Sequence, residues 1–523
     1  MGIAKKLREK AEERVQQQSG NSNALLSIND NVIISDKKAK NKPISEEMEV
    51  SELLHNMLLV ITPVDFEITF TQKLNDPLYK YTTKKRIDLQ KVPKSLYSVA
   101  IMKELQAIIE KYGWDFAQQD GMLYLYTGKY WVKVKDDDVR AFLGQVTIKM
   151  GYYSPAEAMS KNFSDLLFKQ FQHSSYFSPV TSDKNKVLIN LENGTYEITA
   201  EGAILRKHCK EDFLTYCLPF SLNQEDSAPL FTKYLNRVLP DPSSQSVLQE
   251  FIGYIFIRHL KLEKALILLG GGQNGKSVMF EIISALLGSQ NISTKSLGDL
   301  VDKDSGNDNR AKLKDKLVNY GSEISAKGMD VDMFKRLVSG EPVAAREKYK
   351  TSFDLKNNCK FIFNANKLPV EIEHTEAYFR RFIIIPFAVT ISESEKDPEL
   401  HTKIINNELS GVLNWAIIGL NRLLVHKKFS ECEAANVALQ TYKKESNSVA
   451  LMVESEGLAD GYSIEREWRM SNKELYELYK EFCIADGMRA MNRINFSKEL
   501  KNLGFKTYRS GRERGFVIRQ LDE

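Results

Sequence analysis

The sequence predicts an α/β fold in the middle of the chain, between residues 241 and 395. Short apolar runs of the length of buried strands alternate there with segments of helical periodicity. A glycine-rich loop joins the run at residues 264–269 to a helix at 277–287, which is the strand–loop–helix unit of such folds. Regions of mixed helical and strand pattern precede and follow this core.

Length and composition are those of an ordinary globular protein. The chain has 523 residues, with 42% hydrophobic and 27% charged, which is enough for several domains. The net charge of +4 is small, so any contact with nucleic acid must come from local basic patches. The 5 cysteines form no C-x-x-C pair. Because no apolar run could span a bilayer and the charged N-terminus is unlike a signal peptide, we expect a soluble, cytoplasmic protein.

The part of the chain before the core is expected to hold a tether and an α+β region. Residues 1–50 are rich in Lys, Glu, Gln, Asn and Ser, which is typical of a disordered, charged segment. Residues 51–240 mix helical patterns with strand–turn–strand patterns. The clearest of these is Val187–Ile198, with Asn193 and Gly194 at its turn.

The most specific motif is the glycine-rich loop, in which GGGQNGKS fits G-x-x-x-x-G-K-[ST]. Glycines let backbone N–H groups curl round phosphates, and the following helix points its positive N-terminus at the anion. Lys276 can reach the β- and γ-phosphates, and the Ser277 hydroxyl can ligate Mg²⁺. The pattern predicts a site for ATP and Mg²⁺ formed by Gly270, Gly271, Gly272, Gln273, Asn274, Gly275, Lys276, Ser277 and Val278.

Other polar residues follow or precede the later apolar runs. ATP hydrolysis needs an acidic residue at the end of a neighbouring strand, to hold the metal or polarise the attacking water, and Glu323 ends such a run. Asn366 ends another and can hydrogen-bond the γ-phosphate or the water. Arg380 and Arg381 precede the last run. Either could be an arginine finger that reaches the phosphates bound by a neighbouring subunit, and a salt-bridged surface is the alternative.

The order and spacing of these motifs resemble the superfamily-three helicases, specifically the phage and plasmid primase–helicase family with its poxvirus relatives. The resemblance covers roughly residues 100–520. It implies an AAA+-like P-loop ATPase core at 241–395, with a helicase-associated region before it. It also implies a hairpin that lines the channel of the ring and grips single-stranded DNA. The basic residues in the matching segment are Arg346, Lys348 and Lys350. A solvated charged hairpin is the alternative.

The part of the chain after the core is expected to hold three segments. Residues 396–446 have a helical pattern, residues 447–470 have the pattern of a linker, and residues 471–523 have a winged-helix pattern of helix, helix and hairpin. The family often has such a domain at this place. Three arginines at the expected hairpin turn would bind duplex DNA: Arg509, Arg512 and Arg514. A wing that is structural or docks a protein is the alternative.

The family resemblance implies an enzyme, an ATP hydrolase that unwinds DNA during replication of a phage, plasmid or other mobile element. It would translocate on single-stranded DNA as an oligomeric, hexameric ring, with forked DNA, copies of itself and a separate primase as partners. Two alternatives stay open: an origin-binding initiator that uses nucleotide as an assembly switch, and another P-loop DNA motor. The catalytic residues would be Lys276, Glu323, Asn366, Arg380 and Arg381, with Ser277 and Glu323 at the metal.

Overall fold

The computed structural model describes most of the chain. The described residues are 46–72, 88–119, 121–174, 186–199, 201–322, 324, 330–348, 351–356, 358–369, 375–460, 469–488, 490–511 and 513–520. The predicted tether at 1–50 lies outside them except for its end, where helix α2 (Glu46–Leu59) begins. None of the helices in these ranges combines the length and apolar character needed to cross a membrane.

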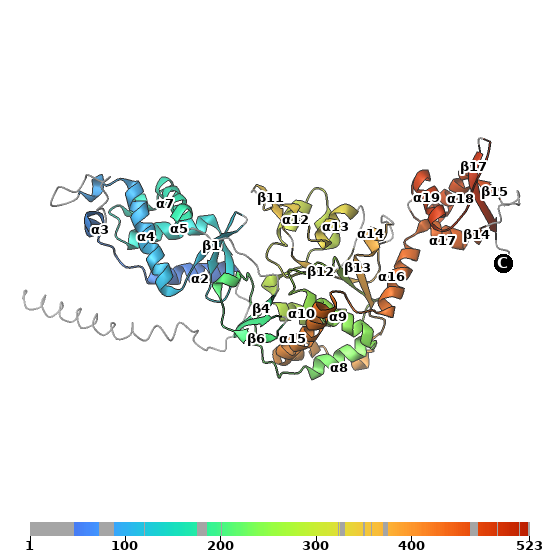
Figure 1. Ribbon diagram of the computed structural model, residues 1–523, viewed down its shortest axis with the longest axis horizontal. Coiled ribbons are helices and arrows are strands. Elements are labelled where there is room, and N and C mark those ends of the chain that lie inside the picture. The colour runs from blue at the N-terminus through green and yellow to red at the C-terminus, as the bar shows by residue number, and fades with distance from the viewer. Residues whose placement is uncertain are drawn as a thin grey trace, which may run out of the picture. The chain divides into compact units, whose positions relative to one another are not determined.

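A helical region with a small antiparallel sheet forms the first part of the described chain (Figure 1). Its sheet has the order β1-β2-β3 and contributes to a hydrophobic core with α2, α4, α5 and α7. Helix α5 spans Asp136–Lys149. The other elements are α3 (Phe66–Gln72), η1 (Leu89–Lys91), α4 (Lys94–Tyr112), β1 (Phe116–Gln119), β2 (Met122–Tyr126), β3 (Trp131–Val134), α6 (Pro155–Ala158) and α7 (Lys161–Ser174).

A second antiparallel sheet, of order β4-β5-β6, leads into the central fold. The predicted strand–turn–strand at Val187–Ile198 is confirmed, and Gly194 at its turn has a φ of +146°. Side chains of β4, β5 and helices α8 and α9 belong to the same buried core as the central sheet. The core therefore does not divide at residue 240, where the sequence predicts a boundary. The bounds are β4 (Val187–Leu191), β5 (Gly194–Ile198), β6 (Ala203–Arg206), η2 (Lys210–Asp212), α8 (Pro229–Val238) and α9 (Pro242–Tyr254).

Helix α9 begins at Pro242 and is capped by the residue before it. The carboxylate of Asp241 accepts hydrogen bonds from the backbone N–H groups of Ser243 and Ser244, at 3.3 and 2.8 Å. Proline is favourable in the first turn of a helix, where its missing N–H has no partner to lose. Asp241 and Pro242 together therefore form the capped start of the helix.

The central sheet is parallel throughout, with the order β13-β7-β12-β9-β8. Residues of β7 alternate between the cores on its two faces, which explains its continuous apolar run. Figure 1 shows α9, α10 and α15 below the strands and α13 and α14 above them. The α/β prediction is confirmed here. The strands are β7 (Ala265–Leu269), β8 (Ile292–Ser293), β9 (Val318–Gly321), β12 (Lys360–Ala365) and β13 (Phe382–Pro386).

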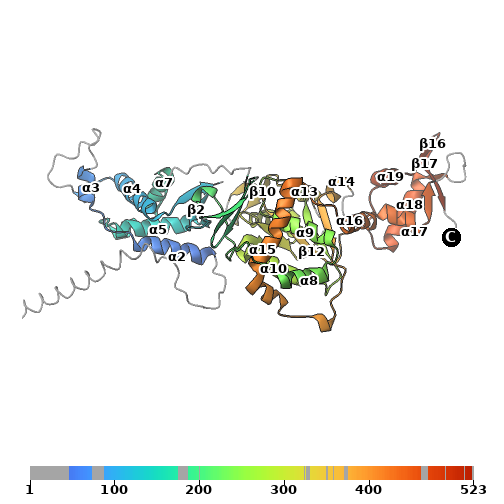
Figure 2. The same cartoon turned by 60° about the horizontal axis from the view of Figure 1, so that its bottom comes forward.

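Helices and one hairpin complete the central fold, and Figure 2 shows α15 alongside α10. The hairpin pairs β10 with β11 in antiparallel register. These elements are α10 (Lys276–Leu287), η3 (Ser289–Asn291), α11 (Leu297–Val301), α12 (Gly306–Ala311), α13 (Val331–Val338), β10 (Val343–Arg346), β11 (Ser352–Leu355), α14 (Glu376–Phe379), η4 (Glu393–Glu395), α15 (Leu400–His426) and α16 (Glu433–Glu445).

The last part of the chain forms a separate hydrophobic core around a four-stranded antiparallel sheet. Part of the predicted linker at 447–470 is ordered: Val449 and Met452 on α17 are buried in this core. The helix, helix and hairpin predicted for the tail are present. The elements are α17 (Ser448–Ser455), β14 (Leu458–Asp460), β15 (Arg469–Ser471), α18 (Asn472–Ala485), α19 (Arg493–Asn502), β16 (Thr507–Ser510) and β17 (Glu513–Gln520).

Candidate functional site

The glycine-rich loop leaves the carboxyl end of β7 and leads directly into α10, which begins at Lys276. Its backbone has positive φ angles at Gly272 (+115°), Gln273 (+49°) and Gly275 (+86°). Gly272 and Gly275 adopt such angles without strain, while Gln273 is a non-glycine residue in this conformation. The carboxyl ends of strands in an open parallel sheet are where α/β folds bind ligands, and a loop of this curvature exposes backbone N–H groups there.

The loop is packed tightly on one side and open on the other. A Cβ on Gly270 would lie 2.0 Å from Nδ2 of Asn274 and 2.5 Å from the carbonyl oxygen of Phe387, so no larger residue fits. Beneath Gly275, the Tyr234 hydroxyl donates a hydrogen bond to its carbonyl oxygen at 2.8 Å. In contrast, a Cβ on Gly271 would meet nothing within 4 Å. The open side is therefore the side on which a ligand could approach the backbone.

Lys276 is the first residue of α10, packed against the loop, and is 7% exposed. Its Nζ donates hydrogen bonds to the Gly270 carbonyl oxygen at 2.5 Å and to Oδ1 of Asn274 at 3.1 Å. Burial lowers the pKa of the Lys276 ammonium. Asn274 is itself fixed, because its Nδ2 donates to the Phe387 carbonyl oxygen at 3.2 Å. The described residues give the ammonium only neutral acceptors, so its positive charge can attract an anion.

A hollow adjoins the loop and is lined by Leu269–Asn274 together with Pro386, Phe387, Ala388 and Thr390. Ser277 is exposed in the first turn of α10, and Val278 is half-buried beside it. The curved backbone, the buried ammonium, the exposed hydroxyl and the helix N-terminus are the groups that a triphosphate and its Mg²⁺ need. The residues present therefore fit these ligands.

Asn366 lies next to the loop, as the sequence predicts. It follows β12, the strand between β7 and β9, and its side chain is exposed. The Gly270 backbone N–H donates to the carbonyl oxygen of Ala365 at 3.0 Å, which brings the residue before Asn366 against the start of the loop. Glu323 lies outside the described residues. The strand before it, β9, ends at Gly321 on the other side of β12.

Arg380 and Arg381 lie at the opposite end of the sheet from the loop. They precede β13, which runs parallel to β7 in the register Phe382 to Ala265 and Pro386 to Leu269. The length of β7, at about 3.3 Å per residue, therefore separates these arginines from the loop of the same chain by roughly 16 Å. Within one chain they are too far away to contact a phosphate held there.

The two arginines differ in their surroundings. The side chain of Arg381 is 8% exposed, and its Nη2 lies 3.4 Å from a carboxylate oxygen of Glu263 and 2.9 Å from Oγ of Ser339. Its Nη1 also donates to the backbone carbonyl of Ala377. The side chain of Arg380 is 64% exposed, and it lies 3.7 Å from Glu263. Arg381 is thus a buried structural residue, and Arg380 is available at the surface.

The predicted basic hairpin is present as β10 and β11, packed against α12. Arg310 of α12 anchors it, since its Nε donates to the Ala344 carbonyl oxygen at 2.9 Å. Arg346, at the end of β10, lies 3.2 Å from Asp308 in an exposed ion pair. Lys348 lies in the connection between the strands, and Lys350 lies outside the described residues.

In the C-terminal region, Arg509 and Arg514 face each other across the β16–β17 hairpin as a directly paired position. Both are exposed. Like charges at such a position repel, which destabilises the hairpin unless an anion lies between or beside them. Arg512 lies outside the described residues.

Sequence reasoning missed the residues that support the loop from distant segments. Tyr234 belongs to a helix that the sequence assigns to the preceding region, and Phe387 follows β13. Ile391 donates its backbone N–H to the carbonyl oxygen of Gln273 at 2.8 Å. A pattern in one sequence does not reveal such pairs. Only the adjacency of β13 and β7 brings the segment after β13 to the loop.

Two protein-family models match this chain. A family described as D5 N terminal like matches residues 100–240. A family of unknown function, DUF5906, matches residues 268–381, which run from β7 to the arginine pair.

Among curated proteins, the chain is similar to two viral proteins that are provisionally named helicases. One is L207/L206 of Acanthamoeba polyphaga mimivirus, 24% identical over 251 residues, which are 46% of this chain and 26% of that protein. The other is 121R of Invertebrate iridescent virus 3, 24% identical over 259 residues, which are 46% of this chain and 25% of that protein. The chain thus spans about a quarter of the length of these relatives.

Among solved structures, the chain is similar to the apo C-terminal region of NrS-1. Its A form is 14% identical, with a TM-score of 0.47 over 81% of this chain and 100% of that one. A further apo structure of the region (305–718) is 14% identical, with a TM-score of 0.46 over 81% of this chain and 99% of that one. The D5 match and the viral relatives connect the chain, at low identity, with viral helicase-like proteins.

Proposed function

We propose that this chain is an ATP-driven DNA helicase of the superfamily-three type, which unwinds DNA in the replication of a virus, phage or other mobile element. The observation that carries the proposal is the loop at Gly270–Ser277. It is closed on one side, open on the other, and holds a buried Lys276 ammonium against neutral acceptors. The two viral relatives that are named helicases support the choice of a DNA motor among nucleotide-binding proteins.

In this proposal, backbone N–H groups of the loop bind the phosphates of ATP, and the Lys276 Nζ transfers its hydrogen bonds from Gly270 and Asn274 to phosphate oxygens. The Ser277 hydroxyl and Glu323 would hold Mg²⁺, which neutralises phosphate charge when bound. Glu323 orients and polarises the attacking water. Asn366, adjacent to Gly270, donates a hydrogen bond to that water or to the γ-phosphate.

We assign the role of arginine finger to Arg380, which would act on the nucleotide bound by the neighbouring subunit. An arginine contributes to phosphoryl transfer by neutralising transition-state charge, so it must reach the phosphates. Arg380 is at the wrong end of the sheet to reach the loop of its own chain, and its exposed side chain is free to enter an interface. Arg381 instead positions this segment through Ser339 and Glu263. The proposal therefore requires a ring, for which six subunits are expected.

Single-stranded DNA would contact the β10–β11 hairpin through its cations, Arg346, Lys348 and Lys350. Contacts from lysine and arginine to phosphates bind DNA without reading its sequence. Duplex DNA would contact the tail, in which α17, β15, α18, α19 and the β16–β17 hairpin follow one another in the order of a winged helix. Its hairpin would use Arg509, Arg512 and Arg514.

The test uses the full chain and its Lys276→Ala variant, with the exposed Lys303→Ala as the matched control. We expect Lys276→Ala to lose DNA-stimulated ATP hydrolysis and strand displacement on a forked substrate, while its affinity for DNA in a gel-shift assay is retained. Lys303→Ala should retain all three properties. ATP turnover by Lys276→Ala at the wild-type rate would contradict the assignment of the loop. Wild-type hydrolysis without strand displacement would contradict the helicase and favour the nucleotide-switched initiator.

A further inference from the structure

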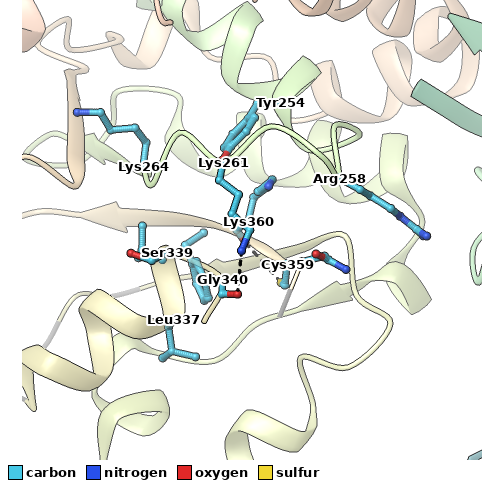
Figure 3. Close-up of a pocket in the computed structure, with 12 residues that line it drawn as sticks. Tyr254, Arg258, Lys261, Lys264, Leu337, Ser339, Gly340, Cys359 and Lys360 are labelled. Carbon is cyan, nitrogen blue, oxygen red and sulfur yellow. Dashed lines mark hydrogen bonds between the residues drawn. The ribbon is translucent and has the colours of Figure 1, made fainter. Parts of the chain in front are cut away.

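A second group of basic residues lies at a pocket at the amino ends of β7 and β12 (Figure 3). This is the end of the sheet opposite to the glycine-rich loop, so the two sites are separate within one chain. The pocket is formed by segments from the end of α9, the end of α13 and the start of β12. The residues that the argument uses are Tyr254, Arg258, Lys261, Lys264, Ser339 and Lys360.

The lining of this pocket is strongly positive. Figure 3 shows Lys261 and Lys360 side by side at the pocket, while the side chains of Arg258 and Lys264 extend away from it on either side. No aspartate or glutamate is among the described residues that line it. The neighbouring carboxylate of Glu263 pairs with Arg380 and Arg381 instead. The Lys261 and Lys360 ammonium groups repel each other with no anion of the described residues between them, which favours capture of a negative ligand.

Lys360 is the most unusual member of the group. It is 9% exposed, and its Nζ lies 4.0 Å from the centroid of the Tyr254 ring. No carboxylate of the described chain forms an ion pair with it. The Tyr254 hydroxyl accepts a hydrogen bond from the Leu262 backbone N–H at 2.9 Å. A ring face compensates a buried ammonium only in part, so Lys360 retains the capacity to bind an anion.

The other cations are held in place by neutral groups. The Lys261 Nζ donates to the Gly340 carbonyl oxygen at 3.4 Å, as the dashed line in Figure 3 shows, and the Lys264 Nζ donates to the Arg380 carbonyl oxygen at 2.5 Å. Ser339 Oγ accepts from Arg381 and keeps its hydroxyl proton to donate. The donors of the pocket are thus oriented before any ligand binds.

We propose that this pocket binds a phosphate group, as a site distinct from the proposed nucleotide site. Its interior volume of about 20 Å³ has room for little more than one water-sized atom. One oxygen of the ligand therefore occupies the interior, and the rest of the ligand stays outside the pocket. A tetrahedral oxyanion can do this while its other oxygens accept hydrogen bonds from the Lys261 and Lys360 ammonium groups. Free phosphate and the DNA backbone both supply this chemistry.

The test measures thermal unfolding of the full chain without nucleotide, in inorganic phosphate and in chloride at equal ionic strength. We use the Lys276→Ala background, so that the glycine-rich loop contributes less phosphate binding. We expect phosphate to raise the midpoint over chloride by on the order of 2 °C, because a ligand that binds only the folded state stabilises it. Addition of Lys360→Met should abolish that rise, and addition of the exposed control Lys303→Met should preserve it.

A rise that persists in Lys360→Met, or an equal effect of chloride and phosphate, would overturn the proposal. If Lys360→Met does not fold, Lys261→Met removes an exposed cation of the same pocket and decides the question in the same way. A labelled single-stranded oligonucleotide identifies the source of the phosphate. If it is the DNA backbone, Lys360→Met weakens binding several-fold and lowers the salt slope by about 1. If it is free phosphate, DNA affinity is unchanged while the thermal shift is lost.

Discussion

The side chain of Arg381 donates a hydrogen bond from Nη2 to Oγ of Ser339 at 2.9 Å. Together with Glu263 and Ala377, this contact buries Arg381 at the start of β13. Arg380, the adjacent residue, is 64% exposed and reaches only a distant carboxylate oxygen of Glu263 among the described residues. Two neighbouring arginines of the same sequence pattern are therefore expected to have different roles.

We predict that Arg380→Ala lowers the turnover number for ATP by 10³- to 10⁵-fold, as expected when a finger is removed, with little change in the free energy of unfolding. Arg381→Ala should instead destabilise the fold by about 1–3 kcal/mol, because it leaves Ser339 and Glu263 without their partner. Steady-state ATPase assays and urea unfolding measure the two effects. A normal turnover number in Arg380→Ala would remove Arg380 from catalysis.

A mixing experiment tests whether Arg380 acts across the subunit boundary. Arg380→Ala subunits retain an intact loop, and Lys276→Ala subunits retain the finger. Mixed rings should therefore recover part of the ATPase activity that each variant lacks alone. Recovery depends on interfaces in which an intact loop faces an intact finger. If mixed rings form but recover no activity, the cross-subunit assignment is wrong.

Glu408 caps helix α8, and Tyr234 of that helix donates a hydrogen bond to the carbonyl oxygen of Gly275 in the glycine-rich loop. Helix α8 has no side-chain cap of its own at Ala228. Instead, the Glu408 carboxylate of α15 accepts the backbone N–H groups of Leu230 and Phe231, each at 2.9 Å. We predict that Glu408→Ala costs about 1–3 kcal/mol of stability in urea unfolding, since it leaves the buried N–H of Phe231 and the part-buried N–H of Leu230 unpaired. The exposed Glu399→Ala is the control, and equal destabilisation by both would refute the capping role.

Sequence alone predicts the elements around the loop well, because their signals are local. The apolar run of β7, the glycines and the start of α10 lie within a few residues of one another, and Asn193-Gly194 marks its own turn. The cap of α8 could not be predicted, because Ala228 offers no side-chain acceptor and Glu408 comes from a helix far along the chain. The order of the parallel strands has no local signal either.

In the candidate site, too, features with a local sequence signal could be predicted and features that depend on distant residues could not. Lys276 and Asn366 follow from the spacing of their motifs, and the structure brings the segments of both to one edge of the sheet. The difference between Arg380 and Arg381 depends on Ser339 and Glu263, which lie far from the pair in sequence. The phosphate pocket around Lys360 combines segments from three regions, so no spacing could indicate it.

Lys360 should make the stability of the protein depend on alkaline pH. Burial lowers its pKa from the ordinary 10.5 to about 8. Below pH 8 the lysine is protonated in both the folded and unfolded states, and its buried charge costs up to about 3 kcal/mol. From pH 8 to 10.5 the unfolded chain binds more protons, so the free energy of unfolding rises with pH.

In buffer without phosphate, we therefore predict that Lys360→Met is more stable than the wild type at pH 7 and that the difference shrinks as pH rises from 8 to 10. Urea unfolding at each pH measures it, with Lys303→Met as the control. A difference that is constant over this range would show that the charge of Lys360 is not the cause of the cost.

Arg509 and Arg514 are paired across the β16–β17 hairpin. Removal of one of these charges is expected to affect the stability of the fold and the affinity for DNA in opposite directions. Without DNA, like charges opposite each other repel, so Arg509→Ser should leave the melting temperature unchanged or raise it slightly. With DNA, loss of one phosphate contact should weaken duplex binding and lower the slope of log K against log salt by about 0.9. Fluorescence anisotropy with duplex DNA between 50 and 200 mM salt measures this slope, and the exposed Lys473→Ser on α18 is the control. A wing that only stabilises the fold would lower the melting temperature in Arg509→Ser and leave the salt slope intact, because no phosphate would then depend on the arginine.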